Sequence, residues 1–368
     1  MRLLICAGMT GGGIYPALAV HQALVDKTEA ALWVGSENGL EESLLAPFNI
    51  SFRSIPGGGI HGMGAAQLVR NTIELTRGYQ KAKQIIKDFS PDVIFYTGGY
   101  IGVPMAFAAR RTPSVVFVPD IEPGLALKTI IKKAEIICVS TDLSTEYINH
   151  SKNMIVTGYP LREEIKEWNR ESGRGHFGIG KSEKIILIFG GSKGARSIND
   201  ALIPNINALT KDSHIIHITG VANWEACQSM IDQESLNEPE RYHPYPFMHS
   251  EMGAALASAD LVVCRAGAST IGELPYFGLP AILVPYPHAW RYQRQNADYL
   301  TGAKAAVLLR DSQLQDQLLP TINQLILDEK KLDAMKMNMK NIAVDGAAAR
   351  IADVIDGVAQ GSKGEKSL

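Results

Sequence analysis

Residues 2–20 read RLLICAGMTGGGIYPALAV, and residues 184–203 read KIILIFGGSKGARSINDALI. Each stretch places a short apolar run before a glycine cluster and a helix-like segment after it. A glycine-rich turn between a strand and a helix commonly cradles a phosphate group. The two stretches therefore predict that each half of the chain opens with the same strand, turn and helix.

The same alternation continues through both halves of the chain, where short apolar runs alternate with segments of helical period. Parallel strands joined by crossover helices produce this pattern, so we expect an α/β fold of two doubly wound, Rossmann-like domains facing a cleft. The expected strands are RLLICA, AALWVG, DVIFY, SVVFV, AEIICVS and MIVTG in the first half, and KIILIF, HIIHITG, ADLVVC and AILVP in the second.

The length of 368 residues is about twice that of a usual domain, which agrees with two domains. We expect an N-terminal domain over 1–160 and a C-terminal domain over 161–344, joined near TGYPLREEI. The last helix, over 345–360, is expected to begin at Asp345 and to pack back on the first domain. Residues 361–368 are expected to be a disordered tail.

The composition excludes several classes of protein. Hydrophobic residues are 46% and charged residues 20%, and the formal charge of −2 indicates neither disorder nor bulk attraction to nucleic acid. The four cysteines show no paired spacing, which is typical of a reducing cytoplasm. The apolar run at the amino terminus is too short for a signal peptide, and no apolar run is long enough to span a membrane. We expect a soluble or peripheral protein.

Two common phosphate sites do not fit the glycine clusters. A dinucleotide fingerprint G-x-G-x-x-G can be aligned only with Gly11, Gly13 and Pro16, so its third glycine is missing. The strand AALWVG also lacks the acid that would bind a ribose, the nearest being Glu37. Neither glycine cluster ends in G-K-[ST], so neither is a Walker loop.

The C-terminal half carries the more informative loops. In FGGSKGAR, residues 189–196, the glycines precede a helix whose unpaired N–H groups would face a diphosphate. A tight turn without a ligand is the alternative. A second loop, 265–269, begins a helix that contains Glu273, an acid placed to bind two adjacent ribose hydroxyls. Gln293 and Asn296 follow a strand end and are candidates for sugar hydroxyls.

Six motifs together resemble the MurG family of N-acetylglucosaminyltransferases, which complete lipid II of peptidoglycan. They are GMTGGG..PALAV, YTGGYIGVP, TGYPLR, FGGSKGAR, CRAGASTIGE and the stretch ending RYQRQNA, in that order over nearly the whole chain. The resemblance implies an inverting glycosyltransferase of the GT-B fold. Its amino domain takes a lipid-linked acceptor, and its carboxyl domain takes UDP-N-acetylglucosamine (UDP-GlcNAc).

The resemblance also implies roles for individual residues, with Met248 reading the uracil through its backbone and Glu273 binding the ribose. The implied donor-binding residues are Gly191, Ser192, Lys193, Gly194, Met248, Ala268, Ser269, Glu273, Gln293 and Arg162. The implied acceptor or diphosphate loop consists of Thr10, Gly11, Gly12, Gly13, Gly98, Gly99 and Tyr100.

The sequence departs from the family at two places. Gly13 stands where the family has a histidine, and FVPD, residues 117–120, replaces the family's H-E-Q-N. An inverting transfer needs a base near the acceptor hydroxyl, but no covalent intermediate. We expect Asp120 to be that base, with Glu122 as the neighbouring catalytic carboxylate. The alternative for Asp120 is a cap on the turn before Pro123.

No metal or other cofactor is expected, because the chain has no D-x-D pair and the UDP-sugar is a substrate. His214 and His217 are offset so that they point to opposite faces of a strand, which argues against a ligand pair. The departures keep two further functions open. One is a glycolipid synthase with another acceptor, such as diacylglycerol, and the other is a UDP-sugar-binding protein that has lost catalysis.

A local basic surface suggests where the acceptor is met. The expected helix over 68–87 combines apolar residues with five basic residues and one acid, Glu74, and Lys132 and Lys133 lie in the same half. Such a surface suits the inner leaflet of the cytoplasmic membrane, so we expect a peripheral protein on the cytoplasmic face. An ordinary amphipathic helix with a solvated basic face is the alternative.

Overall fold

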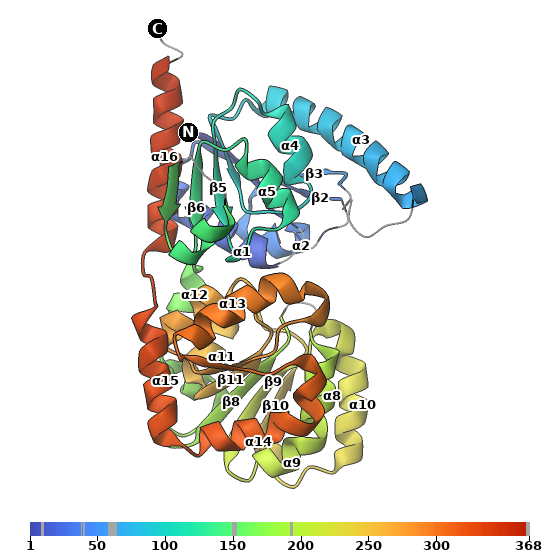
Figure 1. Ribbon diagram of the computed structural model, residues 1–368, viewed down its shortest axis with the longest axis vertical. Coiled ribbons are helices and arrows are strands. Elements are labelled where there is room, and N and C mark those ends of the chain that lie inside the picture. Colours follow the sequence, from blue (N-terminus) through green and yellow to red (C-terminus); the bar gives the residue numbers. More distant parts are fainter. Residues whose placement is uncertain are drawn as a thin grey trace. The chain divides into compact units, whose positions relative to one another are not determined.

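The computed structural model describes residues 1–8, 11–37, 39, 41–57, 65–148, 153–191 and 194–365, and the chain divides into two compact units. Unit 1 comprises Met1–Arg162 and Gly346–Leu368, and unit 2 comprises Glu163–Asp345. Figure 1 shows a parallel sheet with helices packed around it in each unit. The prediction of an α/β chain with two doubly wound sheets is confirmed.

Among the described residues of unit 1, seven parallel strands form one sheet in the order β3-β2-β1-β4-β5-β6-β7. The strands are β1 (Arg2–Cys6), β2 (Ala30–Ser36), β3 (Ser51–Ile55), β4 (Val93–Tyr96), β5 (Ser114–Val118), β6 (Ile136–Val139) and β7 (Asn153–Val156). Every residue of β4 and β5 is buried, because helices cover both faces of the sheet. The strand order reverses beside β1, so the loops after β1 and β4 meet at a topological switch point.

The helices of unit 1 include one that comes from the end of the chain. They are α1 (Gly11–Ala23), α2 (Glu41–Leu45), α3 (Ala65–Phe89), α4 (Gly102–Ala108), α5 (Leu125–Ile131) and α16 (Ala347–Glu365), with 3-10 turns η1 (Val25–Lys27), η2 (Ala46–Phe48) and η3 (Asp142–Tyr147). Helix α16 packs against α1, β4 and β5 (Figure 1). The guanidinium of Arg350 on α16 donates to the carbonyl of Thr157 at 2.7 Å, which fixes the helix to the end of β7.

The end of α16 corrects one expectation. Residues 361–365, expected to belong to a disordered tail, continue the helix. Gly361 and Gly364 lower helix propensity by about 1 kcal/mol each, but they retain their backbone N–H groups, so they do not terminate a helix as proline would. Residues 366–368 lie outside the described residues.

Within the described part of unit 2, six parallel strands form a second sheet in the order β10-β9-β8-β11-β12-β13. The strands are β8 (Lys184–Phe189), β9 (Ser213–Ile218), β10 (Tyr242–Tyr245), β11 (Leu261–Cys264), β12 (Ala281–Leu283) and β13 (Ala306–Leu308). Alternate residues of β8 enter two apolar cores, with Ile186 in one and Leu187 in the other. The order reverses beside β8, which places the loops after β8 and β11 next to each other.

The helices of unit 2 pack on both faces of this sheet. They are α6 (Glu163–Lys166), α7 (Arg170–Phe177), α8 (Arg196–Leu202), α9 (Ile206–Leu209), α10 (Trp224–Glu234), α11 (Met252–Ser258), α12 (Thr270–Phe277), α13 (Trp290–Gly302), α14 (Leu314–Ile326) and α15 (Glu329–Asn341). The 3-10 turns are η4 (Ile203–Asn205), η5 (Val221–Asn223), η6 (Pro239–Arg241), η7 (Pro287–Ala289) and η8 (Asp311–Gln313).

Candidate active site

In unit 1, the two predicted glycine segments meet at the carboxyl ends of β1 and β4. The hydroxyl of Thr97, which follows β4, donates to the carbonyl of Gly13 at 2.7 Å. Gly98 and Gly99 have φ values of +135° and +86°, a region that favours glycine. A Cβ at Gly99 would lie 3.3 Å from the carbonyl oxygen of Gly8. Glycine at this position therefore lets the two loops approach closely.

The first glycine segment is a helix start rather than a loop. Helix α1 begins at Gly11, and none of the glycines 11–13 has a positive φ. Their amides therefore belong to the first turn, where N–H groups have no intrahelical acceptor. A Cβ at Gly13 would lie 3.6 Å from its nearest neighbours, an ordinary contact. The space around the Cβ position of residue 13 is therefore sufficient for the first carbon of the histidine side chain that the family has there. Thr10 lies outside the described residues.

Arg162 belongs to unit 1 and packs on the same helix start. Its guanidinium carbon lies 4.0 Å from the centroid of the Tyr15 ring, a cation–π contact. The hydroxyl of Tyr159 donates to the carbonyl of Gly12 at 3.4 Å. The TGYPLR motif therefore contacts the start of α1 through two side chains, and Tyr100 begins the turn into α4.

The two candidate carboxylates of unit 1 have different surroundings. Asp120 follows β5 and is half-buried at the carboxyl edge of the sheet. Glu122 is 1% exposed, and its Oε1 lies 2.9 Å from Nζ of Lys128 on α5. The buried ion pair of Glu122 therefore connects the loop after β5 to α5.

A buried carboxylate that the sequence did not single out lies at the same edge. Glu41 is fully buried, and its Oε1 accepts hydrogen bonds from Ser36 Oγ at 2.6 Å and Ser36 N at 3.2 Å. A Cβ at Gly8 would lie 2.1 Å from that oxygen, so the glycine makes room for the carboxylate. Burial and Glu41 together raise the pKa of the Cys6 thiol. The sequence EES gave no signal beyond an acidic helix start.

In unit 2, the glycines after β8 have distinct structural reasons. A Cβ at Gly190 would lie 2.1 Å from the amide nitrogen of Ala195, and one at Gly194 would lie 2.4 Å from the carbonyl oxygen of Thr219. Gly191 has φ +87°, and apart from its chain neighbours none of the described residues lies within 4 Å of a Cβ there, while its carbonyl accepts from the amide of Gly194 at 2.9 Å. Gly190 and Gly194 are therefore needed for close packing of the turn, and Gly191 for its positive φ. Ser192 and Lys193 lie outside the described residues.

The loop after β11 leads into α12 and its buried acid. The hydroxyl of Thr270 donates to the carbonyl of Gly267 at 2.6 Å, which closes the loop that contains Ala268 and Ser269. Glu273, in the first turn of α12, is 7% exposed. Burial of the Cys264 thiol at the end of β11, together with the nearby carboxylate of Glu273, raises the pKa of that thiol. Glu273 therefore lies at the carboxyl edge of the sheet, as the sequence predicts.

Three further predicted residues lie around these loops. Oε1 of Gln293 accepts a hydrogen bond from the amide of Tyr286 at 2.8 Å. Asn296 is fully buried and donates to the carbonyl of Ala266 at 3.1 Å, so it supports the loop rather than extending into solvent. Met248 follows β10 and packs its side chain into one apolar core of unit 2.

Across the described ranges, no group of three or more His, Cys, Asp or Glu side chains is arranged to hold a metal ion. His214 bonds Glu183 at 3.0 Å and His243 at 3.1 Å. His217, fully buried, bonds Tyr242 at 2.8 Å. The two histidines therefore have different hydrogen-bond partners. Of the helices whose residues are described, none is long and apolar enough to cross a bilayer.

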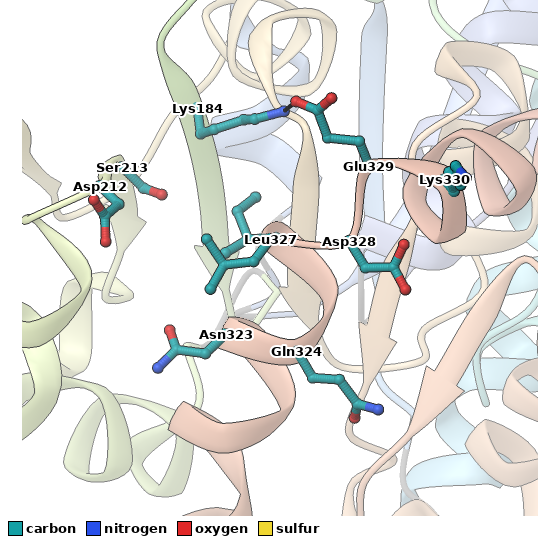
Figure 2. Close-up of a pocket in the computed structure, with 10 residues that line it drawn as sticks. Lys184, Asp212, Ser213, Asn323, Gln324, Leu327, Asp328, Glu329 and Lys330 are labelled. Carbon is teal, nitrogen blue, oxygen red and sulfur yellow. Dashed lines mark hydrogen bonds and ion pairs between the residues drawn. The ribbon is translucent and has the colours of Figure 1, made fainter.

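An open groove of about 790 Å³ lies at the other end of the unit 2 sheet (Figure 2). Lys184 and Ser213, which begin β8 and β9, line it together with Leu327 and the Lys184–Glu329 ion pair. Ligands of doubly wound sheets bind at the carboxyl ends of strands, so this groove is not the predicted donor site.

Each unit is doubly wound and has a switch point at the carboxyl ends of its strands, as in two-domain glycosyltransferases. Residues 3–139 match the glycosyltransferase family 28 N-terminal domain, and residues 185–351 match the glycosyltransferase family 28 C-terminal domain. The solved structure of MurG from Acinetobacter baumannii superposes with a TM-score of 0.74 at 25% identity, covering 96% of this chain and 99% of that one.

Two curated relatives carry the name UDP-N-acetylglucosamine–N-acetylmuramyl-(pentapeptide) pyrophosphoryl-undecaprenol N-acetylglucosamine transferase. The one from Halalkalibacterium halodurans is 33% identical over 98% of this chain and 100% of its own length. The one from Roseiflexus is 34% identical over 97% of this chain and 94% of its own length. The chain belongs to the MurG family of glycosyltransferase family 28.

Proposed function

We propose that this protein transfers N-acetylglucosamine from UDP-GlcNAc to a polyprenyl-diphosphate-linked N-acetylmuramoyl-peptide, with inversion at the anomeric carbon. The observation that carries the proposal is the meeting of the loops after β8 and β11, where Gly191 adopts a positive φ and Glu273 lies one turn into α12. Full-length similarity to named transferases of this activity supports the choice of donor and acceptor.

The donor chemistry follows from the groups at this edge of unit 2. The backbone N–H of Gly191 stabilises the negative charge that grows on the departing diphosphate, and the N–H of Gly194 holds the turn by donating to the Gly191 carbonyl at 2.9 Å. The carboxylate of Glu273 accepts hydrogen bonds from two ribose hydroxyls, and the backbone of Met248 reads the uracil edge. Gln293 contacts the donor sugar. Ser192, Lys193, Ala268 and Ser269 complete the diphosphate contacts.

The acceptor chemistry belongs to unit 1. Asp120 removes the proton from the acceptor hydroxyl as that oxygen attacks the anomeric carbon and the bond to the UDP oxygen breaks. The amides of Gly11, Gly12 and Gly13, with Thr10 and the turn Gly98, Gly99 and Tyr100, bind the acceptor diphosphate. Glu122 holds Lys128 and contributes to folding. Diphosphate binding by backbone amides requires no metal ion, so we expect a chelator to leave the rate unchanged.

The inner leaflet of the cytoplasmic membrane is the proposed partner surface, which makes the protein peripheral on the cytoplasmic face. Ile73 on α3 is 51% exposed and Phe107 on α4 is 41% exposed, and α3 packs against α4 (Figure 1). Nζ of Lys133 lies 5.4 Å from the centroid of the Phe107 ring. Exposed apolar side chains beside lysines suit an anionic lipid surface. Side chains of residues 65–72 lie outside the described ones.

Two alternatives remain, because unit 1 departs from its family. Transfer to another lipid such as diacylglycerol is favoured by the altered stretch at 117–120, and loss of catalysis by Gly13. Release of UDP from UDP-GlcNAc tests all three functions when measured with each acceptor and without any. Release that requires the muramoyl-peptide lipid supports the proposal. Release only with diacylglycerol, or UDP binding without release, would support the first or second alternative.

A further inference from the structure

Arg265 connects four loops at the carboxyl edge of the unit 2 sheet. It follows β11 directly and is 8% exposed. Its Nη1 donates to the carbonyl of Val284, after β12, at 3.2 Å and forms an ion pair with Asp311, after β13. Its Nη2 donates to Oγ of Ser197 in α8, after β8, at 2.8 Å. One guanidinium thus bridges the segments that follow four adjacent strands.

The contacts around this guanidinium form a closed set. Oγ of Ser197 donates to Asp311 Oδ1 at 2.8 Å while it accepts from Arg265, so the three side chains bond to one another. The carbon of the guanidinium lies 5.3 Å from the centroid of the Tyr286 ring. Because these partners differ in direction, the planar fork of an arginine is needed to reach them together, and a lysine cannot replace it.

Arg265 and its partners Ser197 and Tyr286 lie in or beside three of the proposed donor-binding segments. Ser197 lies just after the glycine turn 190–194, and Arg265 itself begins the loop that leads to Glu273. Tyr286, under which the guanidinium lies, donates from its amide to Gln293. The positive charge is matched by Asp311 rather than directed to solvent. The arrangement suits a residue that sets the spacing of the loops.

We infer that Arg265 is a positioning residue that fixes the loops after β8, β11 and β12 in the geometry that binds the UDP portion of the donor. This inference rests on the proposed donor site in unit 2. Arg265 acts through Ser197, Asp311 and Tyr286, and it contributes no atom to the transfer reaction.

A second buried arginine of the same unit provides a matched control. Arg174 on α7 is 2% exposed and pairs with Asp260 at 2.9 Å. It donates to the carbonyl of Gly180 at 2.6 Å and to that of Glu183 at 2.8 Å, before β8. It therefore ties together the amino ends of β8 and β11, whereas Arg265 ties together the carboxyl ends. Loss of either guanidinium group should lower the free energy of unfolding, but only the loss at Arg265 should weaken donor binding.

Calorimetric titration with UDP, below the melting temperature of every variant, tests the inference. Arg265→Lys should weaken UDP binding about 10- to 100-fold, the scale of lost hydrogen bonds to a charged group. Arg174→Lys should bind UDP within about twofold of the wild type, because its hydrogen bonds lie at the opposite edge of the sheet. In transfer assays, Arg265→Lys should raise KM for UDP-GlcNAc much more than it lowers kcat.

Ser197→Ala is a milder variant that keeps the Arg265–Asp311 ion pair and should still weaken UDP binding, by about 3- to 10-fold. If Arg265→Lys does not fold, this variant decides the inference. Wild-type affinity in both Arg265→Lys and Ser197→Ala, or equal losses in Arg174→Lys and Arg265→Lys, would overturn it. A wild-type protein that fails to bind UDP would overturn the proposed donor site and the inference with it.

Discussion

The carboxylate of Glu122 is buried and lies 2.9 Å from the ammonium of Lys128, whereas Asp120, two residues earlier, is half-buried and follows a strand end. Two acids separated by a single residue thus differ in burial and in position. The Glu122 pair connects the loop after β5 to α5. Asp120 retains the position of a base at the carboxyl edge of unit 1.

Asp120→Asn should therefore lower kcat by about 100- to 10,000-fold, the usual contribution of a general base. UDP affinity should stay nearly unchanged, because the proposed UDP contacts lie mostly in unit 2. Glu122→Gln is the matched variant, and it should destabilise the fold by about 1 to 3 kcal/mol through loss of the charged hydrogen bond to Lys128. Steady-state kinetics and denaturant unfolding measure the two effects. Normal turnover in Asp120→Asn would show that another group is the base.

Glu273→Gln should weaken UDP binding by about 1 to 3 kcal/mol, because an amide replaces a carboxylate that accepts hydrogen bonds from two ribose hydroxyls. Binding of UMP and of uridine should weaken by a similar factor, since both retain the ribose. Titration calorimetry with the three ligands measures this. Unchanged affinity in the folded variant would remove Glu273 from the site.

Ile73→Asp and Phe107→Asp should each reduce binding to vesicles that contain an anionic phospholipid, by about 10-fold for a side chain that is buried in the lipid. Leu327→Asp is the control, because Leu327 is 70% exposed beside the unit 2 groove (Figure 2). Vesicle sedimentation measures the bound fraction. Equal losses in all three variants, or none, would argue against this face of unit 1.

The stability of the protein should fall between about pH 6.5 and pH 3 because of His217. Burial lowers the pKa of this histidine to about 3. Asn199 donates to the Thr219 carbonyl through Nδ2, so its Oδ1 accepts from Nε2 of His217, while Tyr242 donates to Nδ1. The ring is therefore held neutral in the folded state.

In the unfolded state, His217 becomes protonated below about pH 6.5. In the folded state, the same histidine becomes protonated only near pH 3. Unfolding is thus favoured as the pH falls, with a slope of up to about 1.4 kcal/mol per pH unit. His217→Gln should be less stable than the wild type near neutral pH and should show a shallower decline. Urea unfolding at a series of pH values checks this. Identical slopes in both proteins would contradict the neutral histidine.

The sequence predicts the buried strands of both sheets, but it misses β3, β10 and β13. All three lie at sheet edges. An edge strand has one neighbour and more exposed surface, so it does not need a continuous apolar run. The stretch SFRSI of β3 alternates exposed and partly buried residues, and Pro244 occurs within β10.

The sequence likewise identifies some residues of the candidate site, whereas other contacts of the site appear only in the structure. Gly191, Gly194 and Glu273 were identified from the sequence, because a positive φ or a helix start leaves a local signal. The Arg265–Asp311 ion pair spans 46 positions along the chain, and it depends on the order of the strands. Such contacts become visible only once the sheet is assembled. The start of α1 at Gly11 likewise depends on how that helix packs in unit 1.

Analysis of the product tests the central claim most directly. The purified protein is incubated with UDP-GlcNAc and an equimolar mixture of the muramoyl-peptide lipid and diacylglycerol, and each lipid is recovered for mass spectrometry and NMR. We expect the muramoyl-peptide lipid alone to gain a single N-acetylhexosamine, in β-linkage because the donor sugar is α-linked. An α-linked product, or a sugar found on diacylglycerol alone, would contradict the proposed function.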